Sequence, residues 1–252
     1  MSPSEIGAAD AAEAGKESGG RMAGSGRVPL SLKLAYTAFM AVLVPVYLTF
    51  YGPTNFLYFC DVALILTLVG IWTNSALLIS ICAVGILAPQ LLWAVDFAAQ
   101  AAGVPLTGMT AYMFNGETSA FLRGLSLFHG WLPFLLVFLV WRLGYDRRAW
   151  AAWSALAVVI LFVCFFLMPP PRPDPGLTPV NINYVWGMSD HAAQTLMPAW
   201  AWFAALVVAF PLLICWPTHR LLIRLMPRAP VTSPVTSAVR FPSASPAGSA
   251  PR

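Results

Sequence analysis

Six long apolar runs occupy the middle of the chain, and short polar segments separate them. Each run is close to the ~20 residues that a helix needs to cross ~30 Å of hydrocarbon. Backbone groups inside a bilayer must hydrogen-bond within their own segment, which favours helices. We therefore predict an all-α polytopic membrane protein, a bundle of six transmembrane helices. The predicted spans are Leu32–Phe50, Asn55–Trp72, Ala76–Val95, Phe121–Trp141, Ala151–Met168 and Ala199–Trp216.

The pattern changes at both ends of the chain. Residues 1–28 are rich in Ala, Gly, Ser and Glu and contain no apolar run, so we predict a disordered tail and no secretory signal peptide there. Residues 227–252 form a second low-complexity tail of Pro, Ser, Ala and Val. The transmembrane domain is expected over residues 29–226. Pro169–Pro171 should end the fifth helix, and Pro89, Pro133 and Pro211 should kink their spans.

Composition supports the membrane class. The chain is 59% hydrophobic and 10% charged, whereas a soluble domain carries roughly 25% charged residues. A β-barrel would show ~10-residue alternating segments instead of continuous runs. With six spans and a cytoplasmic N-terminus, all of the 14 Lys and Arg residues fall on the inner side except Arg123 and Arg172. We therefore expect a bacterial cell (inner) membrane location with both termini cytoplasmic, and no nucleic-acid partner.

The alternating direction of the helices places polar residues of several segments at one depth. The second and fourth helices would run inward and the third outward. A helix rises ~1.5 Å per residue, so Asp61 and His129 should lie ~9–12 Å below the outer boundary. An ionisable residue inside a span is a functional-site hypothesis. The substrate-binding residues expected around this pair are Asn55, Gln90, Asp96, Arg123, Asn183 and Tyr184.

Three of the gathered residues suggest catalysis. Cys60 would be a nucleophile, because the thiolate is the reactive form and a nearby imidazole favours it. His129 would be the general base, since histidine titrates near working pH. Asp61 would orient the histidine. Structural alternatives stay open: Asp61 and Arg123 could form an ion pair that holds the bundle, and the His129 ring N–H could bond to a neighbouring carbonyl.

Three stretches of the chain resemble the YwaF-type bacterial integral membrane family and its eukaryotic transmembrane relatives. They are NFLYFCDVALILTLVGIWTNSALLISICAVGILAPQLLW, FLRGLSLFHGWLP, and NINYVWGMSD with the following MPAWAWFAALVVAFPLLICWP. The resemblance covers roughly residues 33–220. It implies a membrane helix bundle, and some eukaryotic relatives look like lipid acyltransferases or hydrolases. Carried over, their helical nucleophile and histidine would fall on Cys60 and His129. In this chain Asp61 follows Cys60 where the relatives lead us to expect a histidine.

Several functions therefore stay open. The first is lipid acyl transfer or ester hydrolysis at an outer-leaflet site, with membrane lipids as partners and Arg123 binding an anionic head group. The alternatives are a small transporter or solute-binding protein, and a structural membrane protein without catalysis. A six-helix transporter would be expected to form a homo-oligomer. We find no phosphate loop, zinc motif or Ca²⁺ loop, so we expect no cofactor and no metal site.

Overall fold

The computed structural model describes residues 26–104, 106–116 and 118–230 of the 252-residue chain. Within these ranges the chain forms helices and loops and no β-strand, which confirms the all-α prediction. The predicted tails, 1–28 and 227–252, lie almost wholly outside the described residues. The helices are α2 (Leu30–Phe50), η1 (Pro53–Leu57), α3 (Phe59–Thr73), α4 (Ala76–Ala101), η2 (Ala111–Met113), α5 (Ala120–Ser126), α6 (Phe128–Leu143), α7 (Ala149–Leu167), η3 (Ile182–Tyr184), α8 (Ala199–Ala209), η4 (Phe210–Cys215) and α9 (Trp216–Leu225).

Five segments of the described chain are long and apolar enough to cross a membrane. They are α2, α4, α7, the α5–α6 pair over Ala120–Leu143, and the α8–α9 segment over Ala199–Leu225. The chain is therefore a helical membrane protein by length and composition. The predicted span Asn55–Trp72 is divided between η1 and α3, and α3 has 15 residues. That length reaches about 22 Å, so the sixth span stays a prediction.

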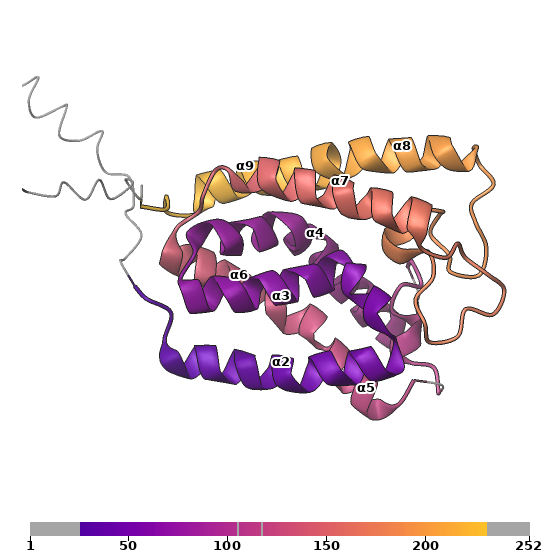
Figure 1. The fold of residues 1–252 in the computed structure, drawn as a ribbon, viewed down its shortest axis with the longest axis horizontal. Helices are drawn as coiled ribbons and strands as arrows, with labels where there is room; N and C mark the ends of the chain where they lie inside the picture. Colours follow the sequence, from indigo (N-terminus) through magenta and orange to yellow (C-terminus); the bar gives the residue numbers. More distant parts are fainter. Residues whose placement is uncertain (1–25, 105, 117, 231–252) are drawn as a thin grey trace, which may run out of the picture.

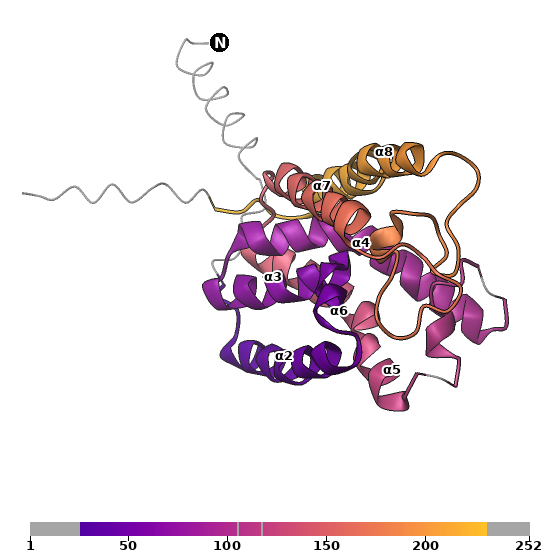
Figure 2. The ribbon, with the colours of Figure 1, turned by 45° about the vertical axis from the view of Figure 1, so that its right-hand side comes forward.

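Helix α4 lies at the centre of the bundle and packs against α3, α6 and α7. Helix α2 covers α3 on one side, while α7 and the α8–α9 segment lie on the opposite side (Figures 1 and 2). The described chain begins and ends at the same end of this bundle (Figure 1). We call it the arginine end, after Arg27, Arg142, Arg147, Arg148 and Arg228. The long loops 102–119 and 168–198 lie at the other end, the loop end (Figure 2).

A glycine sets the close approach of α4 and α7. Trp153 of α7 is completely buried, and its indole ring packs on Gly85 of α4. A Cβ added to Gly85 would overlap this ring. Because a buried tryptophan contributes a large apolar area, this contact stabilises the packing of α4 against α7.

The predicted span Phe121–Trp141 is interrupted in the structure. Helix α5 ends at Ser126 and α6 begins at Phe128, with Leu127 between them. The Gly130 amide donates to the Leu127 carbonyl at 2.9 Å, one residue short of the i−4 partner of an α-helix. The Ser126 carbonyl is thereby released from the helical ladder and can accept a hydrogen bond from a side chain.

The last span is also irregular, as its internal proline predicts. Residues Phe210–Cys215 form a π-helical turn between α8 and α9, with Pro211 near its start. The Pro211 carbonyl accepts a hydrogen bond from Trp150 Nε1 of α7 at 3.1 Å. The same carbonyl also accepts the Trp216 backbone amide that closes the π-helical turn. The Trp150 bond therefore adds a contact between α7 and the distorted segment. Phe210 itself faces the site described next.

Candidate functional site

A cavity of about 820 Å³ lies at the loop end of the bundle. This size is typical of small-ligand sites. Its walls come from α2, α3, α4, α6, α8 and the two long loops. Seven of the nine residues predicted for the site line this cavity, namely Asn55, Cys60, Asp61, Gln90, His129, Asn183 and Tyr184. Asp96 and Arg123 are not among the lining residues.

Asp61 is the buried carboxylate of the cavity wall. It is 3% exposed, and its Oδ2 accepts from Asn55 Nδ2 at 3.3 Å and from Cys60 Sγ at 3.7 Å. Its Oδ1 is buried and has no hydrogen-bond partner in the described part of the chain. Across those same residues the one salt bridge joins Arg148 to Asp146 at the arginine end. Asp61 therefore has no cationic side chain paired with it there.

Arg123 is held away from Asp61. Its Nη1 donates to the Met113 carbonyl at 3.1 Å, so its polar contact is with the 102–119 loop. The Asp61–Arg123 ion pair, one of the structural alternatives, is thus not formed among the residues described. The sequence indicates how far along its helix Asp61 or Arg123 lies. The Arg123 side chain, however, turns toward the 102–119 loop, whose path no sequence periodicity predicts.

Asp96 holds the 102–119 loop in place. It is fully buried, and its Oδ1 accepts from the Thr107 amide at 2.6 Å. Its Oδ2 accepts from the Thr110 amide at 3.0 Å and from the Thr110 hydroxyl at 2.6 Å. Three hydrogen bonds tie the 102–119 loop to the end of α4, and they leave this carboxylate outside the cavity wall.

His129 has a fixed ring orientation. Its Nδ1 lies 2.8 Å from the Ser126 carbonyl, the group that the α5–α6 break releases. A carbonyl only accepts, so Nδ1 carries the proton and Nε2 keeps the lone pair of the neutral ring. The ring also stacks on Trp93 with centroids 5.0 Å apart. The packed-histidine alternative is therefore realised, and it is compatible with a basic Nε2.

Asn183 fastens the 168–198 loop to the start of α3. Its Oδ1 accepts from the Phe59 amide at 3.1 Å, and its Nδ2 donates to the Leu57 carbonyl at 2.9 Å. Asn183 and Tyr184 both have positive φ, 58° and 61°, a region that asparagine tolerates better than tyrosine. Asn183 thus positions the first turn of α3, which carries Cys60 and Asp61, and presents Tyr184 to the cavity.

Tyrosines dominate the aromatic wall of the cavity, and only Tyr184 among them was predicted from the sequence. Of the seven tyrosines in the chain, five line the cavity. They are Tyr47, Tyr51, Tyr58, Tyr112 and Tyr184. Burial raises the pKa of Tyr184 to about 12, so its hydroxyl is neutral at physiological pH. Tyr47 and Tyr51 are four residues apart at the end of α2 and pack on each other. Tyr58, Tyr112 and Tyr184 come from other segments, so no single sequence spacing groups the five.

The charged residues of the wall are acidic. Asp61, Asp174 and Asp190 line the cavity, and no Lys or Arg of the described chain does so. Burial raises the pKa of the Asp190 carboxyl, an effect that Asn181 and His191 oppose. The basic lining groups are the histidines His129 and His191. The cavity therefore favours neutral or cationic ligands over anions.

Two further observations bear on identity and cofactors. Comparisons with protein-family models, with curated proteins and with solved structures found no match. Among residues 26–104, 106–116 and 118–230, no three His, Cys, Asp or Glu side chains are grouped so that they could hold a metal ion. What this protein binds must therefore be inferred from the cavity itself.

Proposed function

We propose that this chain is a membrane protein that binds an ammonium-bearing ligand in the loop-end cavity. The observation that carries the proposal is the buried carboxylate of Asp61, which has no Lys or Arg beside it among the described lining residues. An unpaired charge within a membrane protein is expensive. A cationic ligand would supply the missing counter-charge and would be held more tightly for it.

The aromatic wall supports the same ligand class. Quaternary and primary ammonium groups are attracted to the faces of aromatic rings, by about 0.5–2 kcal/mol for each favourable contact. Tyr58, Tyr112, Tyr184 and Trp202 all line the cavity, and none of these rings stacks on another aromatic ring of the described chain. Trp93 is a poorer candidate, because Phe97 and His129 already stack on it.

Two sources of ammonium fit this chemistry: a free solute, or the head group of a zwitterionic phospholipid. A free solute corresponds to a transporter or solute-binding protein, and a head group to a protein that acts on lipid. The 168–198 loop contributes residues 174–180 to the wall, so movement of this loop would regulate entry from the loop end.

Binding can be tested with choline and ethanolamine on the purified full-length protein in a neutral detergent. The matched neutral probe is 3,3-dimethyl-1-butanol, which has the shape of choline without its charge. Tryptophan fluorescence should respond to choline, since Trp93 and Trp202 line the cavity. We expect the neutral probe to bind at least about tenfold more weakly, which corresponds to 1.4 kcal/mol. Equal affinity for the two probes would refute a cation site.

The source of the ligand can be resolved in proteoliposomes. Uptake of labelled choline that Asp61→Asn abolishes would favour the solute. Saturation by phosphatidylcholine in detergent, without uptake of choline, would favour the head group. Asp146→Asn is the matched control, because Asp146 lies at the arginine end and forms its salt bridge with Arg148.

Acyl transfer or ester hydrolysis is the second candidate. It is favoured because Cys60 and His129 line the same cavity, and because the His129 Nδ1 proton is committed to Ser126. The Cys60 thiol, however, donates to Asp61 rather than to His129. When labelled phospholipid is supplied, the variants Cys60→Ala and His129→Ala should lose turnover. The control is Cys82→Ala, which removes a buried thiol on α4. Undiminished turnover in both test variants would end this candidate.

The location and relationship of the protein are further parts of the proposal. The charge asymmetry of the sequence supports a bacterial inner membrane with both termini cytoplasmic, which would make the loop end face outward. Membership of the YwaF-type family rests on the three resembling stretches of sequence. Fusion of an activity reporter to residue 230 would test the orientation directly.

A further inference from the structure

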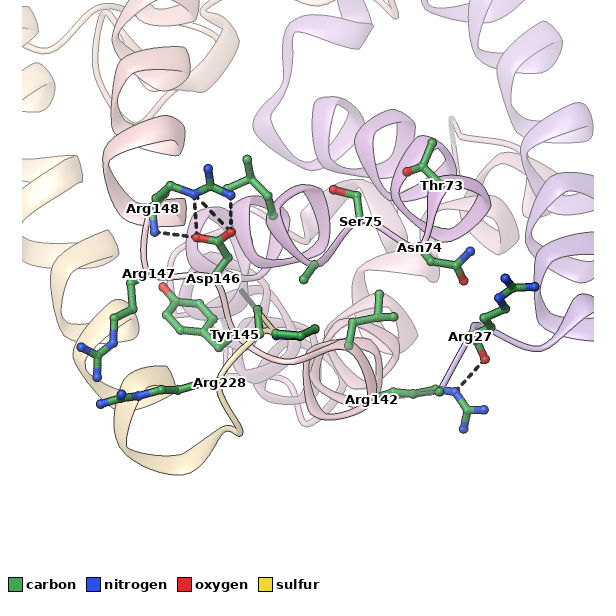
Figure 3. Close-up of a pocket in the computed structure, with 16 residues that line it drawn as sticks. Arg27, Thr73, Asn74, Ser75, Arg142, Tyr145, Asp146, Arg147, Arg148 and Arg228 are labelled. Atoms are coloured by element: carbon green, nitrogen blue, oxygen red, sulfur yellow. Dashed lines mark hydrogen bonds and ion pairs between the residues drawn. The ribbon is translucent and has the colours of Figure 1, made fainter. Parts of the chain in front are cut away.

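A second concave site lies at the arginine end (Figure 3), and it shares no lining residue with the loop-end cavity. It is a groove of about 780 Å³, where the residues before α2, the α3–α4 turn, the α6–α7 loop and the chain after α9 meet. We call it the arginine groove. Its charged lining residues in the described chain are Arg27, Arg142, Arg147, Arg148, Arg228 and Asp146.

Specific backbone contacts hold these separate segments together. The Tyr145 amide donates to the Pro227 carbonyl at 2.7 Å, and the Ala229 amide donates to the Tyr145 carbonyl at 3.1 Å. This pairing fixes Arg228 next to the α6–α7 loop. Gly144 permits it, because its φ is 86° and a side chain there would press on the Ala229 backbone.

The other side of the groove is fixed in the same way. The Val28 amide donates to Asn74 Oδ1 at 2.8 Å, which anchors the start of the described chain to the α3–α4 turn. Arg142 Nε donates to the Arg27 carbonyl at 3.0 Å (Figure 3). The arginines are therefore gathered by defined contacts rather than scattered along helix ends.

The positive charge of the groove is mostly uncompensated. Arg148 pairs with Asp146 at 2.7 Å, and the Arg148 guanidinium lowers the pKa of that carboxyl, which keeps it ionised. Five arginines against one aspartate leave four positive charges. No other ion pair forms in the described part of the chain. Figure 3 shows Arg147 and Arg228 extending to the same side of the groove.

Tryptophans place this groove at the level of lipid head groups. Trp72 is 44% exposed and Trp141 is 60% exposed, and each directly precedes a lining residue, Thr73 and Arg142. Exposed tryptophans concentrate at the boundary between hydrocarbon and head groups. The groove thus opens where lipid phosphates lie, and guanidinium groups bind phosphate through paired hydrogen bonds.

We propose that the arginine groove binds the phosphate of an anionic membrane lipid, with Arg147 and Arg228 as its principal ligands. Arginines that serve only to orient a membrane protein need not converge. Arg220 and Arg224 provide the comparison. Both belong to α9, the last helix of the described chain, and neither lines the groove.

Native mass spectrometry of the purified full-length protein can test the site with phosphatidylglycerol, and with phosphatidylcholine as the lipid control. The double variant Arg147→Gln/Arg228→Gln should weaken phosphatidylglycerol binding about tenfold. The matched double variant Arg220→Gln/Arg224→Gln, with the same loss of charge, should change it less than about twofold. Unchanged melting temperatures in detergent would show that both variants are folded.

The outcomes separate the explanations. Equal loss in the two double variants would overturn the groove, because net charge alone would then explain binding. Equal retention of both lipids by the wild type would overturn it as well. Displacement of phosphatidylglycerol by equimolar inorganic phosphate would overturn the lipid source and leave a site for soluble phosphate.

Discussion

The two side-chain hydrogen bonds of Asn183 to the start of α3, which we call the Asn183 clamp, should contribute strongly to stability at the loop end. Replacing Asn183 with alanine removes the hydrogen bonds to the Phe59 amide and to the Leu57 carbonyl. Each is worth about 1 kcal/mol, and a buried amide left without a partner costs a further ~1–3 kcal/mol. We therefore expect the loss of these interactions in Asn183→Ala to lower the free energy of unfolding by about 3–5 kcal/mol.

A glycine variant separates the side-chain hydrogen bonds of Asn183 from the effect of its backbone conformation. Its φ of 58° disfavours alanine by roughly 1–2 kcal/mol, whereas glycine adopts this region freely. Asn183→Gly should therefore be about 1 kcal/mol less damaging than Asn183→Ala, while both lose the clamp. Thermal unfolding in detergent, followed by tryptophan fluorescence, measures both. If both variants unfold within about 0.5 kcal/mol of the wild type, the amide contributes no clamp.

Other predictions follow from single contacts. Gly85→Ala would force the Trp153 ring from its seat on α4 and should destabilise by about 1–3 kcal/mol, as thermal unfolding would reveal; an unchanged melting temperature would contradict this packing. The pKa of Asp146 is lowered by Arg148, so its contribution to stability is complete above the unfolded pKa of about 3.9 and is lost as pH falls through the lower folded value. Arg148→Gln should therefore flatten the loss of stability on acidification, and an identical pH profile would refute the pairing.

The sequence predicted the membrane class because continuous apolar runs of this length have few alternatives. It also placed Asp61 and His129 at a common depth, since rise per residue is fixed, and both line one cavity. Which way a residue faces was harder to predict. These helices are apolar on every side, so periodicity does not distinguish the face toward the bundle from the face toward lipid.

Asp96 and Arg123 illustrate the difference between predicting how far along a helix a residue lies and predicting which way its side chain faces. Asp96 accepts hydrogen bonds from Thr110, and Arg123 donates to the Met113 carbonyl. These partners belong to a loop whose path depends on tertiary contacts. The break at Leu127 was missed for the same reason, because nothing in its local sequence demands that a helix end there. Most of the tyrosine wall was hidden because Tyr58, Tyr112 and Tyr184 join the neighbouring Tyr47 and Tyr51 only after folding.

The central claim is that Asp61 makes the loop-end cavity selective for a cation. The most direct test is the ratio of affinities for choline and 3,3-dimethyl-1-butanol, measured on the wild type and on Asp61→Asn. We predict a ratio of at least about ten in the wild type and a ratio near one in the variant, with the affinity for the neutral probe unchanged. A ratio that is the same in both proteins would contradict the account.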